Sequence, residues 1–530
     1  MNVRRPVSLL TVVVVCFAFV TGETLAIQMA PDELAGKRLF VDGIGSHGVA
    51  VIAQVGAQST PVPASVSPCA NCHGADGKGR PEGGIQPPDI TWRELEKPYG
   101  HAHDNGRTHS PFDQESFARA VVAGVDPAGN RMDPAMPRYV LSDVDARNLV
   151  AYLKRIDQDH DPGIEPDTLT LGTVLPQRGP LAGSGVEAVV GALIEEANAK
   201  GGIHGRKLRL KVVDAMSKNS ADGAVRELKE VLSGDDVFAF VAPMVPGLAN
   251  EFAGLAESAA VPVVGALTPD GGYEEAGRYL FQPLPGGFEQ ARALAEFAVR
   301  EFGPSLQSVA IVHSDSPRDT ALAEGAEAQF RQRGWTRIAM HSYSVPWHAG
   351  EIVAGIHEAG AQHVLFFGHE REFSALTAAI LASSWSPTLL TPAGHAGRIS
   401  VTVPPQYFGR IFLAFPWTPD DLSRAGARAV SALRRDKGVP ARAIGLQAAA
   451  YAATQVMIEG LKRSGRALSR VKFVDSLENL YGFETGVLPP ISFGPARRVG
   501  VQGAHVVNVD PITRVIQPGG RYIALEPMTP

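Results

Sequence analysis

The chain has 530 residues, of which 45% are hydrophobic and 20% are charged, a composition typical of soluble globular proteins. A chain of this length is expected to form about three domain-sized units. Its formal net charge of −6 lacks the basic excess of nucleic-acid-binding proteins, so nucleic acid is excluded as a partner.

Residues 1–26 have the pattern of a secretory signal peptide. Arg4 and Arg5 precede an apolar run at 7–20, and small residues follow it. The run is short for a bilayer span, and a retained membrane anchor is the alternative. Cleavage would remove Cys16 and leave two cysteines in the mature chain. We therefore predict a periplasmic protein with no membrane span after signal cleavage.

Residues 31–157 are predicted to form the first domain. A short helix is expected from residue 31 to 40, with a proline and two acids at its start. The segment 43–68, rich in Gly, Ser, Val and Pro, is expected to be a loop or insertion rather than part of the core. Two further helices are predicted at 114–123 and 143–156, capped by Asp113 and Ser142.

The sequence Cys69-Ala70-Asn71-Cys72-His73 is a C-x-x-C-H motif, which is typical of c-type haem attachment. Two thiols at this spacing form thioethers with the haem vinyl groups, and the histidine ligates the iron. A zinc half-site is the alternative, but it needs two more ligands at suitable spacing. We predict one covalent haem c held by Cys69 and Cys72, with His73 as an axial iron ligand.

The second axial ligand is expected downstream of the motif. Met136 lies in a proline-rich segment and is followed by a proline, just before the last predicted helix of this domain. Met132 is the rival methionine, and His101, His103 and His109 offer a bis-histidine alternative. A thioether opposite imidazole raises the potential and leaves no open iron site, so Met136 predicts electron transfer rather than oxygen chemistry.

Helices on both sides of a haem motif, with a Met-Pro pair before the last helix, resemble the small all-α cytochrome c domain. The resemblance covers about 125 residues. It implies an electron-carrying domain with one haem.

Residues 158–167 are polar, contain two prolines and have no periodicity, so we predict an interdomain linker. Predicted strands and helices then alternate, which implies parallel sheets covered by helices on both faces. The strands are expected at 169–175, 208–213, 237–241, 261–264, 309–312 and 364–367, and the helices at 185–199, 221–232, 289–302, 321–333 and 370–381. About 350 residues, 168–517, are too many for one such sheet, so two lobes are expected. Residues 518–530 are predicted to be a C-terminal tail.

The L-A-G-S-G run at 181–185 and the N-x-x-G-G-I-x-G-R run at 198–206 resemble the type I periplasmic solute-binding proteins, in their leucine/isoleucine/valine-binding branch. Such proteins close two lobes on a small ligand about a hinge of crossing strands. The resemblance implies a first lobe made of 168–285 and 415–490. It implies a second lobe made of 286–414 and the C-terminal strands.

Ligands of open α/β sheets bind at the carboxyl ends of the strands. The loops there contain the candidate ligand-binding residues Met244, Thr268, Ser314 and Trp417. The loop 242–246 has no Ser or Thr and contains two prolines, unlike the loop that holds the ligand carboxylate in amino-acid-binding members. A less polar small molecule is therefore expected. The alternative for Met244 and Trp417 is a place in the core.

The sequence contains no convincing catalytic site. Residues 183–188 match G-x-G-x-x-A, but seven residues separate the match from the preceding strand, where a dinucleotide fingerprint should begin. No Ser/His/Asp grouping or pair of carboxylates stands out. We predict an electron carrier and ligand-binding protein, not an enzyme.

The two domains together predict a periplasmic c-type cytochrome fused to a small-molecule-binding domain. Its expected redox partner is a periplasmic dehydrogenase. One alternative is the substrate-binding component of a branched-chain-amino-acid-type ABC importer, with an ABC permease as partner and an accessory haem. The other is a ligand or redox sensor.

Overall fold

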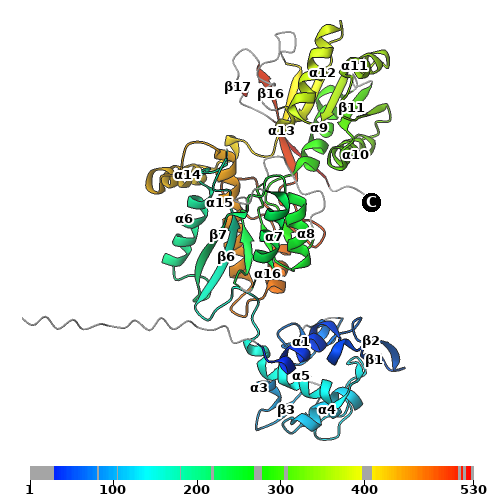
Figure 1. Cartoon of the computed structure of the whole chain (residues 1–530), viewed down its shortest axis with the longest axis vertical. Coiled ribbons are helices and arrows are strands. Elements are labelled where there is room, and N and C mark those ends of the chain that lie inside the picture. The colour runs from blue at the N-terminus through cyan, green and yellow to red at the C-terminus, as the bar shows by residue number, and fades with distance from the viewer. Residues whose placement is uncertain are drawn as a thin grey trace, which may run out of the picture. The chain divides into compact units, whose positions relative to one another are not determined.

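The computed structural model describes residues 29–530 except 80, 82, 104–105, 180, 216–219, 235, 268–276, 304–307, 397–408, 511–514, 517–520 and 527–530. The predicted signal peptide, 1–26, therefore lies outside the described residues. The chain divides into two compact units, Met1–His160 and Asp161–Pro530, and this division falls within the predicted linker. The first unit contains α1 to α5, and the second contains α6 to α16 (Figure 1).

The first unit is mainly helical. Its α-helices are α1 (Pro31–Asp42), α2 (Cys69–His73), α3 (Trp92–Leu95), α4 (Gln114–Ala123) and α5 (Asp143–Arg155). Both predicted caps are present, because Asp113 Oδ1 accepts the Ser116 N–H at 2.8 Å and Ser142 Oγ accepts the Asp145 N–H at 3.1 Å. The rings of Phe40 in α1 and Tyr152 in α5 lie 5.5 Å apart in the core between the two helices.

A small antiparallel sheet completes this unit, and here the prediction of a loop at 43–68 was wrong. Strands β1 (Ile52–Val55) and β2 (Thr60–Pro63) form a hairpin, and β1 also pairs with β5 (Arg138–Val140). Val51, Ala53 and Ala64 are buried. The segment therefore contributes small apolar side chains to the core. A separate pair, β3 (His101–Ala102) and β4 (Thr108–His109), precedes α4.

The first lobe of the second unit contains a five-stranded parallel sheet in the order β10-β9-β8-β6-β7. Its strands are β6 (Thr168–Val174), β7 (Lys207–Val213), β8 (Ala239–Val241), β9 (Val263–Val264) and β10 (Leu280–Phe281). Its helices are α6 (Val186–Ala199), α7 (Ala221–Leu232), α8 (Ala249–Ser258), α14 (Arg424–Lys437), α15 (Ile444–Arg463) and α16 (Arg470–Glu478).

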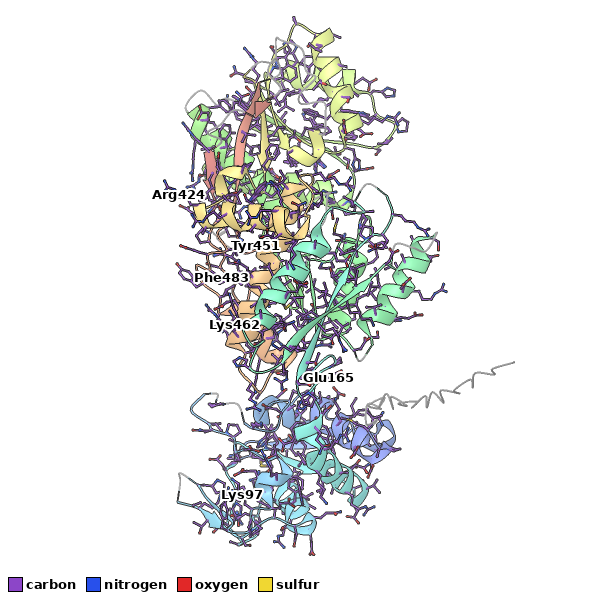
Figure 2. The ribbon with its side chains drawn as sticks, turned by 90° about the vertical axis from the view of Figure 1, so that its left-hand side faces the viewer. Lys97, Glu165, Arg424, Tyr451, Lys462 and Phe483 are labelled. Atoms are coloured by element: carbon purple, nitrogen blue, oxygen red, sulfur yellow. The ribbon has the colours of Figure 1, made fainter. Side chains whose placement is uncertain are left out.

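Helices cover both faces of this sheet. One core cluster joins the sheet to α6, α15 and α16, and another joins it to α7 and α8. Tyr451 and Lys462, labelled in Figure 2, lie on α15, which packs against α6 although the two helices are far apart in sequence. The predicted return of residues 415–490 to the first lobe is confirmed for these helices.

The second lobe contains a mixed sheet in the order β12-β11-β13-β14-β15-β16-β17, with β18 also paired to β16. Its strands are β11 (Val309–Ser314), β12 (Ile338–Tyr343), β13 (His363–Phe367), β14 (Thr388–Pro392), β15 (Ile411–Phe415), β16 (Gly503–Asp510), β17 (Val515–Ile516) and β18 (Arg521–Ala524). Its helices are α9 (Gly287–Phe302), α10 (Pro317–Gln332), α11 (Ala349–Glu358), α12 (Glu370–Ala382) and α13 (Ala393–Ala396). One core cluster contains α9 and α10, and the other contains α11 and α12.

The predicted C-terminal tail needs a correction. Strand β18, at Arg521–Ala524, lies within the range 518–530 and pairs antiparallel with β16. Ile523 is 2% exposed and belongs to the core of the second lobe. This stretch is therefore part of the sheet rather than a separate tail.

Three connections join the two lobes. The first follows β10, and there Gln282 donates its backbone N–H to the carbonyl of Arg498 at 2.8 Å and accepts the Gly500 N–H at 2.7 Å. The second is the segment 499–503 itself, which leads into β16. The third follows β15, where the Trp417 indole donates to the Val487 carbonyl at 2.7 Å. These crossings lie where the family resemblance predicts the hinge, and the hinge itself stays a prediction.

Among the described residues, no helix is long and apolar enough to cross a membrane.

Candidate functional site

The haem motif lies on helix α2. Residues three apart in a helix lie on the same side, so the Cys69 and Cys72 side chains are within one turn of each other. Both thiols are free, with Cys69 half-buried and Cys72 exposed. Burial raises the pKa of the Cys69 thiol to about 11. Attachment of haem to these two thiols stays a prediction.

His73 follows at the end of α2 and is 7% exposed. Its Nδ1 lies 3.0 Å from the carbonyl oxygen of Pro88, so the ring donates Nδ1–H to this carbonyl and keeps the Nε2 lone pair free. Burial lowers the pKa of His73 below its ordinary value. A neutral imidazole with a free Nε2 is the form that ligates iron.

A glycine-rich turn brings Pro88 to this position. Gly79 has a φ of +85° and donates its N–H to the His73 carbonyl at 2.8 Å. A Cβ at Gly79 would lie 2.0 Å from the carbonyl oxygen of Pro87. Only glycine satisfies both the positive φ and this close approach. The turn therefore fixes the orientation of the histidine ring through the backbone.

The segment with both candidate methionines packs against the same core as α2. Met132 and Met136 are both half-buried. The backbone N–H of Met136 donates to the Asp133 carbonyl at 3.1 Å, and the Met132 N–H donates to the Gly124 carbonyl at 2.9 Å. Two half-buried thioethers thus lie on one hydrogen-bonded loop, and Met136 as the axial ligand stays a prediction.

The histidines of the bis-histidine alternative form a separate cluster around β3 and β4. His101 Nε2 lies 2.7 Å from the Glu94 carbonyl, and His109 Nδ1 lies 2.8 Å from the Ser110 carbonyl. His103 Nε2 lies 3.0 Å from His109 Nε2. All three rings are engaged in hydrogen bonds, and the described part of the chain contains no group of His, Cys, Asp or Glu arranged to hold a metal ion.

These residues fit haem c. The chain offers two free thiols in one helical turn, a neutral histidine whose other nitrogen is held by a carbonyl, and thioether sulfurs on a nearby loop of the same core. Bound haem would be held by Cys69 and Cys72, with His73 on the iron. This is the donor set of a c-type cytochrome.

The predicted solute residues occupy different environments. Met244 has no exposed surface, belongs to the core of the first lobe and donates its N–H to the Val174 carbonyl at 2.6 Å. Met244 therefore lies in the core, as the alternative interpretation of this residue expected. A contact between Met244 and a ligand stays a prediction. Thr268 lies outside the described residues. Trp417 is half-buried in the crossing segment after β15.

Ser314 ends β11 and is 8% exposed. Its hydroxyl donates to Asp319 Oδ2 at 2.5 Å and lies 3.0 Å from Ser316 Oγ. Asp319 is itself buried in the first turn of α10. Ser314 is thus at the carboxyl end of its strand as predicted, but its hydrogen bonds are made to neighbouring residues.

Sequence reasoning missed a polar group at the same edge of the second sheet. Tyr343 ends β12 and is 5% exposed, and Glu372 in the first turn of α12 is 8% exposed. Among the described residues, neither the Tyr343 hydroxyl nor Glu372 Oε2 has a hydrogen-bond partner. Burial, reinforced by the charge of Glu372, raises the pKa of Tyr343. No signal in the sequence analysis pointed to this group, because no strand was expected at 338–343.

Gly368 and His395 complete this group, which we call the lobe-two polar cluster (Tyr343, Gly368, Glu372 and His395). A Cβ at Gly368 would lie 2.1 Å from the Tyr343 hydroxyl oxygen, so glycine makes room for the phenol. The Gly368 N–H donates to His395 Nδ1 at 3.2 Å. Burial lowers the pKa of His395 to about 4, so this ring is neutral near pH 7.

Comparisons with known proteins agree with both halves of this description. The periplasmic binding protein family model matches residues 168–514, and the cytochrome c family model matches residues 65–157. Leu/Ile/Val-binding protein homolog 7 of Brucella abortus (strain 2308) is 26% identical over 250 residues, or 44% of this chain and 60% of the relative. Homolog 8 of the same strain is 26% identical over 215 residues, or 38% of this chain and 52% of the relative. The chain thus spans only 52–60% of the length of these relatives.

Solved structures have the same two-lobed fold. A fatty acid ABC transporter substrate-binding protein from Thermomonospora curvata covers 70% of this chain, with 95% of its own length matched, 13% identity and a TM-score of 0.51. A periplasmic binding protein type 1 from Bordetella pertussis Tohama I covers 68% of this chain, with 100% of its own length matched, 16% identity and a TM-score of 0.51. At these identities the likeness establishes the fold alone. The chain belongs to the periplasmic binding protein family, and it carries a cytochrome c domain ahead of its binding domain.

Proposed function

We propose that the protein is a periplasmic electron carrier with one covalent haem c, whose second domain binds a small molecule. The observation that carries the proposal is the orientation of His73 by the Pro88 carbonyl, next to the two free thiols of α2 and on the same chain as a two-lobed binding fold. Bound haem c supplies a one-electron couple between ferric and ferrous iron. Both domains are of non-enzymatic kinds, which supports the absence of a catalytic role.

The residues of the first domain then have distinct tasks. Cys69 and Cys72 would hold the porphyrin by thioethers, and His73 Nε2 and the Met136 thioether would hold the iron. With both of these ligands supplied by the protein, bound haem would provide electron transfer rather than chemistry at an open site.

The second domain binds its solute where the carboxyl ends of the strands meet. Ser314, Trp417 and the lobe-two polar cluster form the polar side of this site. The loop 242–246 of the first lobe is apolar and contains no Ser or Thr hydroxyl, which supports a less polar molecule over an amino acid. The Tyr343 hydroxyl and Glu372 Oε2 have no hydrogen-bond partner in the described structure. They would therefore hydrogen-bond a hydroxyl or amine on that molecule.

The proposed redox partner is a periplasmic dehydrogenase that oxidises the same class of solute. The test is to mix the oxidised full-length protein with a reduced quinoprotein dehydrogenase in a stopped-flow instrument and follow haem reduction. Reduction on a millisecond to second timescale, faster with the solute present, is the expected result. A haem that stays oxidised with every dehydrogenase tested would contradict this role.

The likeness to Leu/Ile/Val-binding protein homologs supports a second candidate, the substrate-binding component of an ABC importer with an accessory haem. Its partner would be an ABC permease. Deleting the gene separates the two candidates. Loss of solute uptake with normal respiration favours import, whereas normal uptake with slower solute-dependent respiration favours electron transfer.

A redox-sensing role is distinguished by thermodynamic linkage. If haem oxidation state alters solute affinity, solute binding must shift the haem midpoint potential by the equivalent free energy. Titrating the potential with and without saturating solute tests this. An unchanged potential removes the sensor role and leaves electron transfer and import.

A further inference from the structure

The loop that carries both candidate methionines is bridged by the side chain of Arg138. Arg138, the first residue of β5, directs its guanidinium back onto the loop before it. Its Nη2 donates to the Met132 carbonyl at 2.9 Å and to the Asp133 carbonyl at 3.2 Å, and its Nη1 donates to the Met136 carbonyl. The Arg138 guanidinium therefore donates hydrogen bonds to three carbonyl oxygens of the five-residue segment 132–136.

The surrounding backbone is shaped to admit this guanidinium. Gly124, which ends α4 with a φ of +67°, lies directly against it, and a Cβ there would be 1.8 Å from Arg138 Nε. The Gly124 carbonyl in turn accepts the Met132 N–H at 2.9 Å. Glycine at this position therefore satisfies the helix end and also leaves space for the arginine.

The strand that carries Arg138 is itself anchored at two places. Arg138 pairs with Gln54 and Tyr139 pairs with Ala53 of β1, in the hairpin within the segment 43–68. Tyr139 is 5% exposed, and its hydroxyl donates to the Ser67 carbonyl at 2.7 Å, two residues before Cys69. Neighbouring residues of a strand point to opposite faces. Arg138 thus holds the methionine loop, while Tyr139 holds the haem-attachment segment.

We propose that Arg138 is the positioning residue that holds the methionine loop in place to supply an iron ligand to bound haem. This inference rests on the proposed electron-carrier function. A thioether is a weak iron ligand, and ligands of this kind depend on neighbouring hydrogen bonds that fix their orientation. The guanidinium holds the backbone of both methionines in one arrangement, so a thioether of this loop would ligate the iron of bound haem without rearrangement of the loop.

The test uses the full-length protein, matured with haem in the periplasm, as wild type and as Arg138→Ala, Arg138→Lys and Gly124→Ala. Two readouts report on the iron: the weak methionine–iron absorption band of the oxidised protein, and the affinity of the oxidised haem for added imidazole. Arg131→Ala is the matched control, because Arg131 is an exposed arginine of the neighbouring segment. The circular dichroism spectrum and the haem content check that each variant folds and matures.

In Arg138→Ala we expect a weakened methionine band and an imidazole affinity raised about tenfold, equivalent to ~1.4 kcal/mol, close to one charged hydrogen bond. Arg138→Lys is expected to give a methionine band and an imidazole affinity between those of wild type and Arg138→Ala, because one ammonium group cannot reach three carbonyls. Gly124→Ala should resemble Arg138→Ala, since its Cβ displaces the guanidinium. Arg131→Ala should behave as wild type.

Normal band and imidazole affinity in both Arg138→Ala and Gly124→Ala would overturn the proposal. If Arg138→Ala fails to take up haem, Arg138→Lys and Gly124→Ala decide the question by the same readouts. A wild-type protein without the band would overturn the methionine ligation of the proposed function as well. A wild-type band that survives in every variant overturns the positioning role alone.

Discussion

Nδ1 of His73 lies 3.0 Å from the carbonyl oxygen of Pro88. This carbonyl has no alternative protonation state, so it accepts a hydrogen bond only and fixes the ring with its proton on Nδ1. The contact depends on the glycine-rich turn after α2, which folds the chain back toward the histidine. His73 is therefore oriented by local backbone geometry, whereas the candidate second ligand, Met136, lies on a loop from the other end of the domain.

Met136→Ala is expected to abolish the methionine–iron band of the oxidised protein and to open the reduced haem to carbon monoxide. The reason is that removing the thioether leaves one axial position without a protein ligand. Difference spectra of the periplasmically matured protein measure both effects. Met132→Ala is the matched control and should keep the band. The opposite pattern would assign the iron to Met132.

Gly36→Ala is expected to destabilise the first unit by about 2 kcal/mol. A Cβ at Gly36 in α1 would lie 1.9 Å from the Asn148 carbonyl oxygen and 2.7 Å from Tyr152 Cβ in α5, so the two helices must separate. Thermal unfolding followed in the haem Soret band measures the loss. Gly191→Ala is the control. Gly191 lies within α6 of the second unit, where an added Cβ would have no atom within 4 Å, so this substitution should leave the Soret transition unchanged. An unaltered Soret transition in Gly36→Ala would contradict the tight packing of α1 on α5.

His363 is expected to make the second unit less stable in acid. It is 6% exposed, its Nδ1 has no hydrogen-bond partner in the described structure, and burial lowers its pKa from 6.5 to about 4. The unfolded chain takes up a proton near pH 6.5, whereas the folded protein resists it until about pH 4. The unfolding free energy should therefore fall as pH drops through this window, by up to about 3 kcal/mol from this residue.

Urea unfolding at pH 7, 5.5 and 4 measures this dependence. His363→Leu should remove this contribution and have little effect at pH 7, because a neutral buried ring with an unpaired nitrogen is replaced by an apolar side chain of similar size. His348→Leu, at an exposed position of the same lobe, should retain the full acid sensitivity. Equal pH dependence in wild type and His363→Leu would exclude the contribution of His363.

Tyr343→Phe is expected to weaken binding of the solute by about fivefold without destabilising the free protein. The hydroxyl has no partner in the described structure, so its removal costs no internal hydrogen bond, but a bound solute would lose one, worth ~1 kcal/mol. Isothermal titration with a solute found by thermal-shift screening measures the affinity. Glu372→Gln should also reduce it, and the exposed Glu358→Gln should not. An unchanged affinity in Tyr343→Phe would place the solute away from the lobe-two polar cluster.

Features that depend on residues close in sequence were predictable. The C-x-x-C-H motif sets the haem attachment because its chemistry needs only a fixed spacing along one turn. The caps at Asp113 and Ser142 act on backbone N–H groups three residues away. The alternation of apolar strands and amphipathic helices follows from local periodicity, and it predicted parallel sheets. The length of the segment 168–517 predicted two lobes.

Only the tertiary structure decided the features that join distant segments. The hairpin at β1 and β2 is explained by its pairing with β5, some eighty residues later. The hydrogen bond from the Tyr139 hydroxyl to the Ser67 carbonyl joins residues 72 apart. The full burial of Met244 depends on the packing of the first-lobe core around it. Tyr343 and Gly368 meet because β12 and β13 both pair with β11. Sequence periodicity reports which face of an element is apolar, but strand register and loop closure select which residues meet, and these are set by long-range packing.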